Sequence, residues 1–228
     1  MSAGTNRRDR VTVSGPDTWP FLQSLLSQDL DTVVEGTSRP TLLLTPQGKV
    51  DVLADVERRG DDAVLATDPG WGQHLADALI RFKIRTKVEI SVAPAAPVDA
   101  AAAADEERAR IAAGVPKLGA ELDDSVIPQE AFLERDAVSF TKGCFVGQEL
   151  VCRIDTRGHV NRFLRHLVPE EDAVLLPVGA EIVVDGKVVG TITSSAPGIA
   201  LGFIRREVEP PADAAVGDTA VTVRDLPS

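Results

Sequence analysis

The sequence predicts an α+β fold, in which an N-terminal domain with an antiparallel sheet and flanking helices is followed by a small antiparallel β-barrel. In the first part of the chain, short segments with strand periodicity alternate with amphipathic helical segments. In the last part the periodicity is that of strands alone, interrupted by glycine and proline turns, as is typical of a small barrel. We therefore expect two domains, 1–157 and 158–228, with the boundary close to Gly158–Arg165.

The N-terminal domain is expected to contain a β-hairpin and two amphipathic helices. Its strands are predicted at 11–13, 41–45, 50–57, 63–67 and 88–92. Gly48 in the turn 46–49 can take the positive φ of a tight connection, so the second and third strands form the hairpin. The helices begin at Asp17 or Thr18 and at Gly72. Their apolar faces consist of Trp19, Leu22, Leu25 and Leu26, and of Leu75, Leu79 and Phe82.

The middle of the chain differs in character from what precedes it. Residues 94–105 are mostly alanine and proline without a periodic apolar face, which predicts a linker. A helix is predicted at 106–113, ended by Gly114 and Pro116. Another helix is predicted at 147–155 from its helically spaced apolar residues.

The C-terminal domain is expected to consist of short antiparallel strands. They are predicted at 163–168, 181–184, 187–194, 199–204 and 220–223. Asp185 and Gly186 separate two of these segments, and this dipeptide is the strongest local signal for a two-residue β-hairpin. Several short strands with such turns predict the barrel.

The composition narrows the classes of function. The chain has 228 residues with 24 lysines and arginines against 35 acids, a net charge of -11, which argues against a general nucleic-acid or membrane-surface binder. Two cysteines provide no disulfide framework. Residues 1–10 lack the apolar core of a signal peptide, and no apolar run is long enough for a membrane span. We therefore expect a cytoplasmic protein.

The octapeptide Lys142–Glu149 is the most informative segment. Cys144 lies between Gly143 and Gly147, beside Lys142 and shortly before the predicted helix at 147–155. A nearby cation and a helix N-terminus both favour the thiolate, which is the nucleophilic and metal-binding form. The alternative is a small apolar residue buried in a turn, since free cysteine is among the most buried residue types.

Two groups of charged residues are further candidates for a site. Asp51 and Asp55 share one face of a strand with Leu53 and form either a site or a solvated strand face. Guanidinium groups bind carboxylates and phosphates, so a basic segment could hold such an anion. That segment contains Arg153, Arg157, His159, Arg162, Arg165 and His166. An exposed linker is the alternative for Arg162 and Arg165.

The sequence shows no motif for a zinc site, a disulfide, a nucleotide site or a nucleophile elbow. The spacing of the histidines and of Cys144 and Cys152 matches none of the usual zinc motifs, so no metal site is predicted. In a helical segment the two cysteines would be too far apart for a disulfide, and Cys152 is expected in the core. No Walker motif, dinucleotide fingerprint or nucleophile elbow is present.

The octapeptide, together with Arg153 and the pair Arg157-Gly158, resembles the signature of the YgfZ branch of the folate-binding family that includes the glycine-cleavage T-protein, an aminomethyltransferase. The resemblance covers most of the chain. The other similar segments are 10–17 with 21–23, 46–50, and 111–116 followed by Glu121 and 128–130.

This resemblance implies a tetrahydrofolate pocket in the N-terminal domain and a role in the assembly or repair of iron-sulfur clusters. Cys144 would be the catalytic or otherwise functional thiol facing the pocket. The residues expected to bind the cofactor are Lys142, Gln148, Glu149, Arg153, Arg157 and Asp51. The expected partners are the folate and iron-sulfur client or assembly proteins, with tRNA and a second copy of the chain as further candidates and no membrane.

Two other functions stay open alongside this one. The first is tetrahydrofolate-dependent one-carbon transfer, but the acid pair of the T-protein corresponds to Val52 and Leu53 here. We therefore expect a transferase-like protein without aminomethyltransferase activity. The second is a non-catalytic interaction module, because relatives carry an additional sheet segment near 94–105 and this chain is shortened there.

Overall fold

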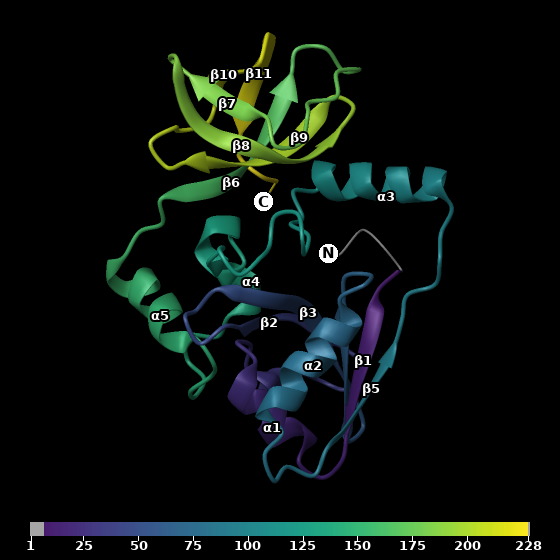
Figure 1. The fold of residues 1–228 in the computed structure, drawn as a ribbon. Coiled ribbons are helices and arrows are strands. Elements are labelled where there is room, and N and C mark those ends of the chain that lie inside the picture. Colours follow the sequence, from purple (N-terminus) through teal and green to yellow (C-terminus); the bar gives the residue numbers. More distant parts are fainter. Residues whose placement is uncertain (1–6, 228) are drawn as a thin grey trace.

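The computed structural model describes residues 7–227 and has the predicted α+β architecture (Figure 1). A five-stranded antiparallel sheet has the order β2-β3-β4-β1-β5, and a closed six-stranded barrel has the order β10-β11-β6-β9-β8-β7. The elements of the first part are β1 (Asp9–Ser14), α1 (Thr18–Leu25), η1 (Leu30–Thr32), β2 (Ser38–Leu44), β3 (Val50–Arg59), β4 (Asp62–Thr67), α2 (Gly72–Phe82), β5 (Glu89–Ala93), α3 (Ala100–Ala112), η2 (Pro128–Ala131), α4 (Glu134–Ala137) and α5 (Gln148–Arg157). The barrel strands are β6 (Arg162–Pro169), β7 (Glu181–Val184), β8 (Lys187–Ala196), β9 (Ile199–Arg205), β10 (Ala212–Val216) and β11 (Thr219–Arg224).

The hairpin β2–β3 carries two features of the candidate site, Asp51 and the turn with Gly48. Along β3, buried residues alternate with partly exposed ones, so Val50, Val52, Ala54 and Val56 face the core. Leu42 pairs with Leu53 in the antiparallel register. The predicted turn is confirmed, with Gly48 at φ +75°.

Both predicted helices of the N-terminal domain are confirmed. α1 buries Phe21, Leu22 and Leu25. Asp17 precedes α1 but does not cap it with its side chain; its Oδ2 accepts a hydrogen bond from the backbone N–H of Lys87 at 2.7 Å. The start of α1 is therefore joined to the segment between α2 and β5.

The prediction of a linker at 94–105 is correct for 94–99 and wrong for the second half. Only residues 94–99 lack regular structure, and α3 begins at Ala100 instead of at residue 106. Alanine has the highest helix propensity, and Asp99 caps the helix by accepting a hydrogen bond from the N–H of Ala102 at 2.9 Å. α3 lies below the barrel, against β8 and β9 (Figure 1).

Four elements have no clear signal in the sequence. They are η1, η2, α4 and the barrel strand β10. β10 consists of alanine and aspartate with one valine, residue types of low strand propensity, and follows two prolines. Pairing with β11 in the closed barrel stabilises β10 as a strand, although its own residues do not favour one.

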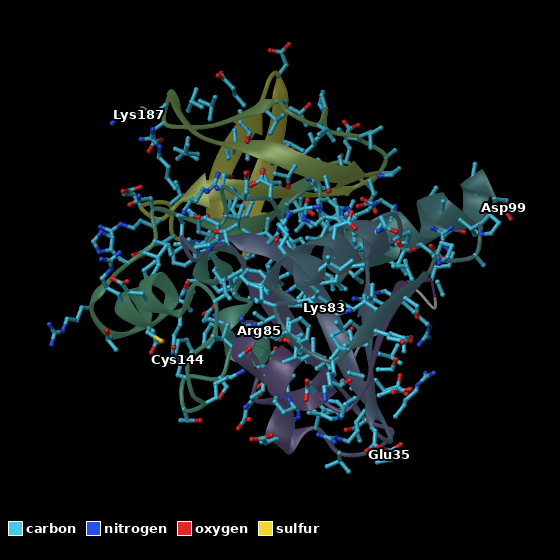
Figure 2. All side chains as sticks on the ribbon, turned by 60° about the horizontal axis from the view of Figure 1, so that its bottom comes forward. Glu35, Lys83, Arg85, Asp99, Cys144 and Lys187 are labelled. Carbon is cyan, nitrogen blue, oxygen red and sulfur yellow. The ribbon has the colours of Figure 1, made fainter. Side chains whose placement is uncertain are left out.

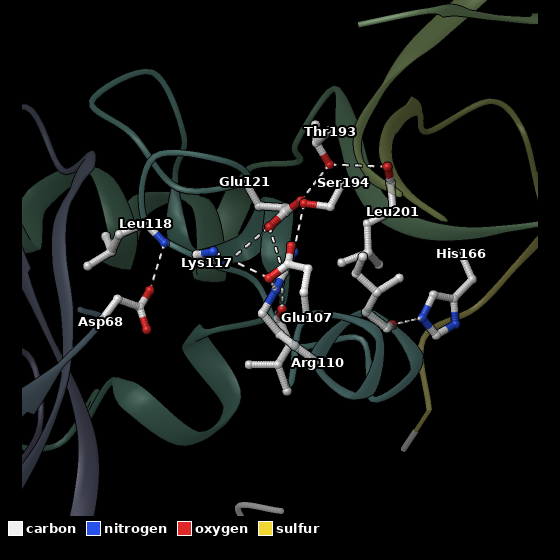
Figure 3. Close-up of polar contacts among 12 residues, drawn as sticks. Asp68, Glu107, Arg110, Lys117, Leu118, Glu121, His166, Thr193, Ser194 and Leu201 are labelled. Carbon is white, nitrogen blue, oxygen red and sulfur yellow. Dashed lines mark hydrogen bonds and ion pairs between the residues drawn. The ribbon is translucent and has the colours of Figure 1, made fainter. Parts of the chain in front are cut away.

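A buried joint of Arg110, Glu121, Thr193 and Ser194 connects the sheet domain to the barrel (Figure 3). The Glu121 side chain is fully buried and accepts hydrogen bonds from Arg110 at 2.9 Å, from Thr193 at 2.7 Å and from Ser194 at 2.5 Å. Burial alone disfavours the charge of Arg110, but hydrogen bonds and ion pairs with Glu107 and Glu121 raise its pKa. Polar groups here are buried but bonded, which holds the two parts in one orientation.

Apolar packing continues across the same junction. The barrel residues Leu164, Leu201 and Phe203 belong to the core of the sheet domain, while a second, smaller core fills the barrel. Among residues 7–227, no helix combines the length and the apolar character that crossing a bilayer requires.

Candidate functional site

The loop of residues 142–147, here called the thiol loop, presents Cys144 to solvent. Cys144 is exposed and free, and Figure 2 shows it at the edge of the molecule. The following residue, Phe145, is buried. The chain then enters α5, so the predicted position of the thiol just before a helix is confirmed. A cysteine buried in a turn, the alternative considered from the sequence, is wrong.

Lys142 anchors the first end of the thiol loop. Its Nζ donates hydrogen bonds to the carbonyl oxygens of Gln23 at 2.8 Å, Leu26 at 2.7 Å and Gln28 at 2.8 Å, at the end of α1. Burial lowers the pKa of Lys142 to about 8, while Asp29 and Asp31 act in the opposite direction. An ammonium group has three N–H bonds, so these carbonyls use all of its donors.

This arrangement changes the role expected for Lys142. A ligand could accept a hydrogen bond from its ammonium group only if a carbonyl at the end of α1 lost one. We therefore assign Lys142 to holding the loop on α1 and do not include it among the groups available to a folate.

Gly147 anchors the other end of the thiol loop. Its φ is +77°, and an added Cβ would lie 2.5 Å from the Thr45 carbonyl oxygen and 3.0 Å from the Gly48 Cα. At Gly48, an added Cβ would lie 2.7 Å from the Cβ of Leu150. The two glycine turns thus pack backbone against backbone, which only glycine permits at both positions. The signature octapeptide and the turn 46–49 are consequently parts of one site.

The outer face of α5 carries free charged groups. Glu149, Arg153 and Arg157 lie four residues apart, so they share one face of the helix, and all three are exposed. Within residues 7–227, none of their side chains makes a hydrogen bond or ion pair with another residue, and Gln148 is half-buried. Arg153 and Arg157 are thus available to an anion. Cys152, expected in the core, is only half-buried.

The remaining basic residues of this segment do not form a cluster with Arg153 and Arg157. Arg162 donates to Glu130 at 3.1 Å, and Arg165, 12% exposed, pairs with Asp225 at 3.2 Å. Both lie on β6, so the alternative of an exposed linker is wrong for them. His166 is buried with its Nε2 2.7 Å from the Ile111 carbonyl oxygen, and burial lowers its pKa. The contacts of Arg162 and His166 cross the junction with the barrel, whereas the pair of Arg165 and Asp225 lies within the barrel part.

Asp51 and Asp55 lie on the partly exposed face of β3 with Leu53, as predicted from strand alternation. Both carboxylates have partners within the chain. The Oδ1 of Asp51 lies 2.7 Å from the His74 Nε2, and its Oδ2 lies 3.5 Å from a guanidinium nitrogen of Arg81. Asp55 accepts a hydrogen bond from Arg8 at 2.9 Å. Neither carboxylate is a free anion on a solvated strand face.

The residues suited to a folate are present in part. A pterin ring needs hydrogen-bonding partners, and the glutamyl carboxylates of a folate need cations. Asp51 and the exposed Arg153 and Arg157 have this chemistry. Two surface hollows, of about 470 and 390 Å³, lie elsewhere, and no residue predicted for the site lines either. Within the described part of the chain, no group of three His, Cys, Asp or Glu side chains is placed to hold a metal ion.

The chain is similar to known proteins over much of its length, although no family model matches it. An aminomethyltransferase of Streptomyces avermitilis is 32% identical over 196 residues, which is 84% of this chain and 49% of that protein. An uncharacterized protein of Haemophilus influenzae is 37% identical over 97 residues, 39% of this chain and 34% of that protein. A putative chloroplastic transferase of Arabidopsis thaliana is 32% identical over 129 residues, 53% of this chain and 27% of that protein. The chain thus spans half or less of the length of these relatives.

A solved structure gives the decisive comparison for the fold. The aminomethyltransferase T of the glycine cleavage system of Bartonella henselae superposes with a TM-score of 0.82, covering 96% of this chain and 83% of that chain at 18% identity. The chain has the aminomethyltransferase T fold. The sequence is thus similar to an aminomethyltransferase over half of that protein's length, and the fold is that of aminomethyltransferase T.

Sequence reasoning missed the contacts that hold this site together. The carbonyls bound by Lys142 lie 114 to 119 positions earlier in the chain, and no local pattern marks them. The contact between Gly48 and Gly147 had a partial signal, because each glycine stands in a segment that was singled out from the sequence.

Proposed function

We propose that this chain is a tetrahydrofolate-binding protein of the YgfZ type that acts in the assembly or repair of iron-sulfur clusters in client enzymes, with Cys144 as its functional thiol. The observation that carries the proposal is the exposed Cys144 in a loop anchored at both ends. We assign residues 1–157 to the folate-binding domain and 158–228 to the barrel, and the cytoplasm as the location.

The geometry of the thiol loop favours chemistry over a structural role for Cys144. The thiol adds nothing to the core and forms no disulfide. Its loop nevertheless contains a half-buried ammonium group with three hydrogen bonds and a glycine that no other residue can replace without strain. An accessible cysteine in an anchored loop can ligate iron transiently or undergo reversible oxidation.

We further propose that the folate binds beside the thiol. Asp51, Gln148 and Glu149 would orient the pterin part, and Arg153 and Arg157 would bind the glutamyl carboxylates through charge-assisted hydrogen bonds. When bound, tetrahydrofolate supplies a carrier for one-carbon groups. The residues of the chain hold and orient this carrier and keep the thiol accessible to a client protein.

Aminomethyl transfer is less well supported than this function. The positions that correspond to the acid pair of the T-protein hold Val52, which is fully buried, and Leu53, which is half-buried. The nearest carboxylate, that of Asp51, has His74 and Arg81 as partners. A substrate amine would therefore have to compete with two side chains of the same chain for this carboxylate.

The test compares the two cysteines in a strain that lacks its own protein of this type. Cys144→Ser is expected to leave the activity of an iron-sulfur enzyme at the level of the deletion strain, whereas Cys152→Ser should restore it. Both variants keep the loop and helix contacts, and thermal unfolding of the purified proteins would verify that they fold. Restoration by Cys144→Ser as complete as that by the parent protein would refute the role of this thiol.

A further inference from the structure

The segment 81–87, here called the basic loop, concentrates positive charge on an acidic protein. Arg81, Lys83, Arg85 and Lys87 are all exposed, and no acidic residue occurs between Asp77 and Glu89. Arg81 reaches Asp51 at 3.5 Å. Among the described residues, the side chains of the other three cations make no ion pair or hydrogen bond. In a chain with a net charge of -11, such a concentration of positive charge is unusual.

Apolar surface accompanies these cations. Ile80 is 51% exposed and Ile84 is 77% exposed, at either side of Phe82. The two hollows adjoin at Thr86, which lines both. Lys83 and Lys87 line the hollow of about 470 Å³, which also includes Glu89. Arg85 lines the one of about 390 Å³ together with Asp17 and side chains of α1. The cations outnumber the acids, and Asp17 already accepts a hydrogen bond from the backbone of Lys87. The basic loop therefore borders a shallow groove of mixed polar and apolar character.

The basic loop has a fixed shape. The backbone N–H of Lys87 donates to Asp17 at the start of α1. Arg85 has a φ of +58°, a left-handed conformation that is rare for residues other than glycine and persists only where surrounding contacts impose it. An ordered loop loses less conformational entropy when a partner binds, which favours recognition over a role as a solubilising tail.

α1 connects the basic loop to the thiol loop. One side of α1 contributes Phe21 and Leu25 to the smaller hollow. Its C-terminal end provides carbonyl groups that Lys142 binds. Figure 2 shows Cys144 at one edge of the view and Lys83 and Arg85 nearer its middle. The two loops are thus linked through opposite parts of the same helix, α1.

We propose that the basic loop is a docking site for an acidic segment of a partner protein, with acidic side chains on Lys83, Arg85 and Lys87 and apolar ones on Ile84. A nucleic acid fits less well, because its uniform charge would extend from this small patch onto an acidic surface. The proposal goes beyond the function of Cys144 and does not depend on it.

The test uses the full chain and a fluorescently labelled short peptide of glutamate, aspartate and leucine. Binding is measured by anisotropy at low salt. Lys83→Glu/Arg85→Glu/Lys87→Glu should weaken binding about tenfold or more, since three charge pairs are lost and reversed. The matched control Lys187→Glu/Arg205→Glu/Arg224→Glu makes the same change of charge on exposed barrel residues and should bind like the parent. Cys144→Ser should also bind like the parent, which separates this proposal from that for the thiol.

Amide spectra of the complex locate the peptide. Changes are expected at residues 14–25 and 82–89, and Ile84→Ser should weaken binding where a purely electrostatic contact would not. Absence of binding, equal weakening in the two triple variants, or changes centred on the barrel would overturn the proposal. So would an RNA oligonucleotide that displaces the peptide from this loop at lower concentration.

Discussion

The thiol loop contains a half-buried cation and the joint between sheet and barrel a largely buried one, and the two cations have different partners. In the joint, the guanidinium of Arg110 has two carboxylates as partners, and Glu121 is wholly enclosed. In the thiol loop, the ammonium of Lys142 has carbonyl groups as its direct partners, and Cys144, two residues further on, is exposed. The joint therefore holds the sheet domain and the barrel in one orientation, whereas the thiol loop holds the side chain of Cys144 in solvent.

The pKa values of the two cations accordingly shift in opposite directions. Carboxylates in direct contact raise the pKa of Arg110 despite burial. Carbonyl dipoles compensate burial less fully, so the pKa of Lys142 falls to about 8. We conclude that the joint is a structural element. In the thiol loop, burial of the Lys142 charge lowers the stability of the folded protein while the loop holds Cys144 in place.

The largest effect is expected in the joint. Glu121→Ala removes the acceptor of Arg110, Thr193 and Ser194 and leaves a buried guanidinium with one carboxylate fewer, so the free energy of unfolding should fall by about 3–5 kcal/mol. Denaturant unfolding measures this fall in the free energy of unfolding. Asp124→Ala, at an exposed position, should change it by less than about 0.5 kcal/mol. Equal effects of the two substitutions would show that the joint is not the structural element described.

The next effect is expected at the second anchor of the thiol loop. Gly147→Ala places a methyl group against Thr45 and Gly48 at a positive φ, which should lower the free energy of unfolding by about 2–4 kcal/mol. Gly143 is the matched control, because a Cβ there would meet nothing within 4 Å. If Gly143→Ala and Gly147→Ala behave alike in denaturant unfolding, the loop is not anchored as the structure implies.

A smaller, pH-dependent effect is expected at Lys142. Its pKa is lowered by burial from 10.5 to about 8, so between these values the unfolded chain binds more protons than the folded one and stability rises with pH. We expect a rise of about 1–2 kcal/mol from pH 8 to pH 10.5, since solvent screens part of the effect at a half-buried group. Lys142→Met should lack this rise. Parallel pH profiles for the two proteins would contradict the burial of this charge.

The smallest effect is expected on the outer face of α5. Arg153→Ala/Arg157→Ala should weaken tetrahydrofolate binding about fivefold by calorimetry, because each exposed ion pair contributes less than about 1 kcal/mol. The unfolding free energy should stay the same, since neither side chain has a partner among residues 7–227. Lys187→Ala is the control for loss of an exposed charge on the barrel. Unchanged folate affinity in the double variant would remove these arginines from the proposed site.

The sequence predicted the local structure better than the contacts of the site. Hairpins with Gly48 and with Asp185-Gly186 follow from turn chemistry, which acts over a few residues. Lys142 and Glu121 have partners that are distant in the chain. These partners are backbone carbonyls and hydroxyl groups, which are too common in the sequence to indicate a particular contact. The helix predicted at 106–113 corresponds to the second half of α3. Its true start at Ala100 was missed because the alanine run lacks an apolar stripe, although alanine alone favours a helix.

The central claim is that Cys144 is a fixed, exposed thiol beside a folate site. It is tested most directly by the rate at which iodoacetamide alkylates each cysteine, followed by mass spectrometry without air and with or without saturating tetrahydrofolate. We predict that tetrahydrofolate slows alkylation of Cys144 at least severalfold and leaves that of Cys152 unchanged. An identical rate for Cys144 in both conditions, in a protein that calorimetry shows to bind the folate, would contradict the account.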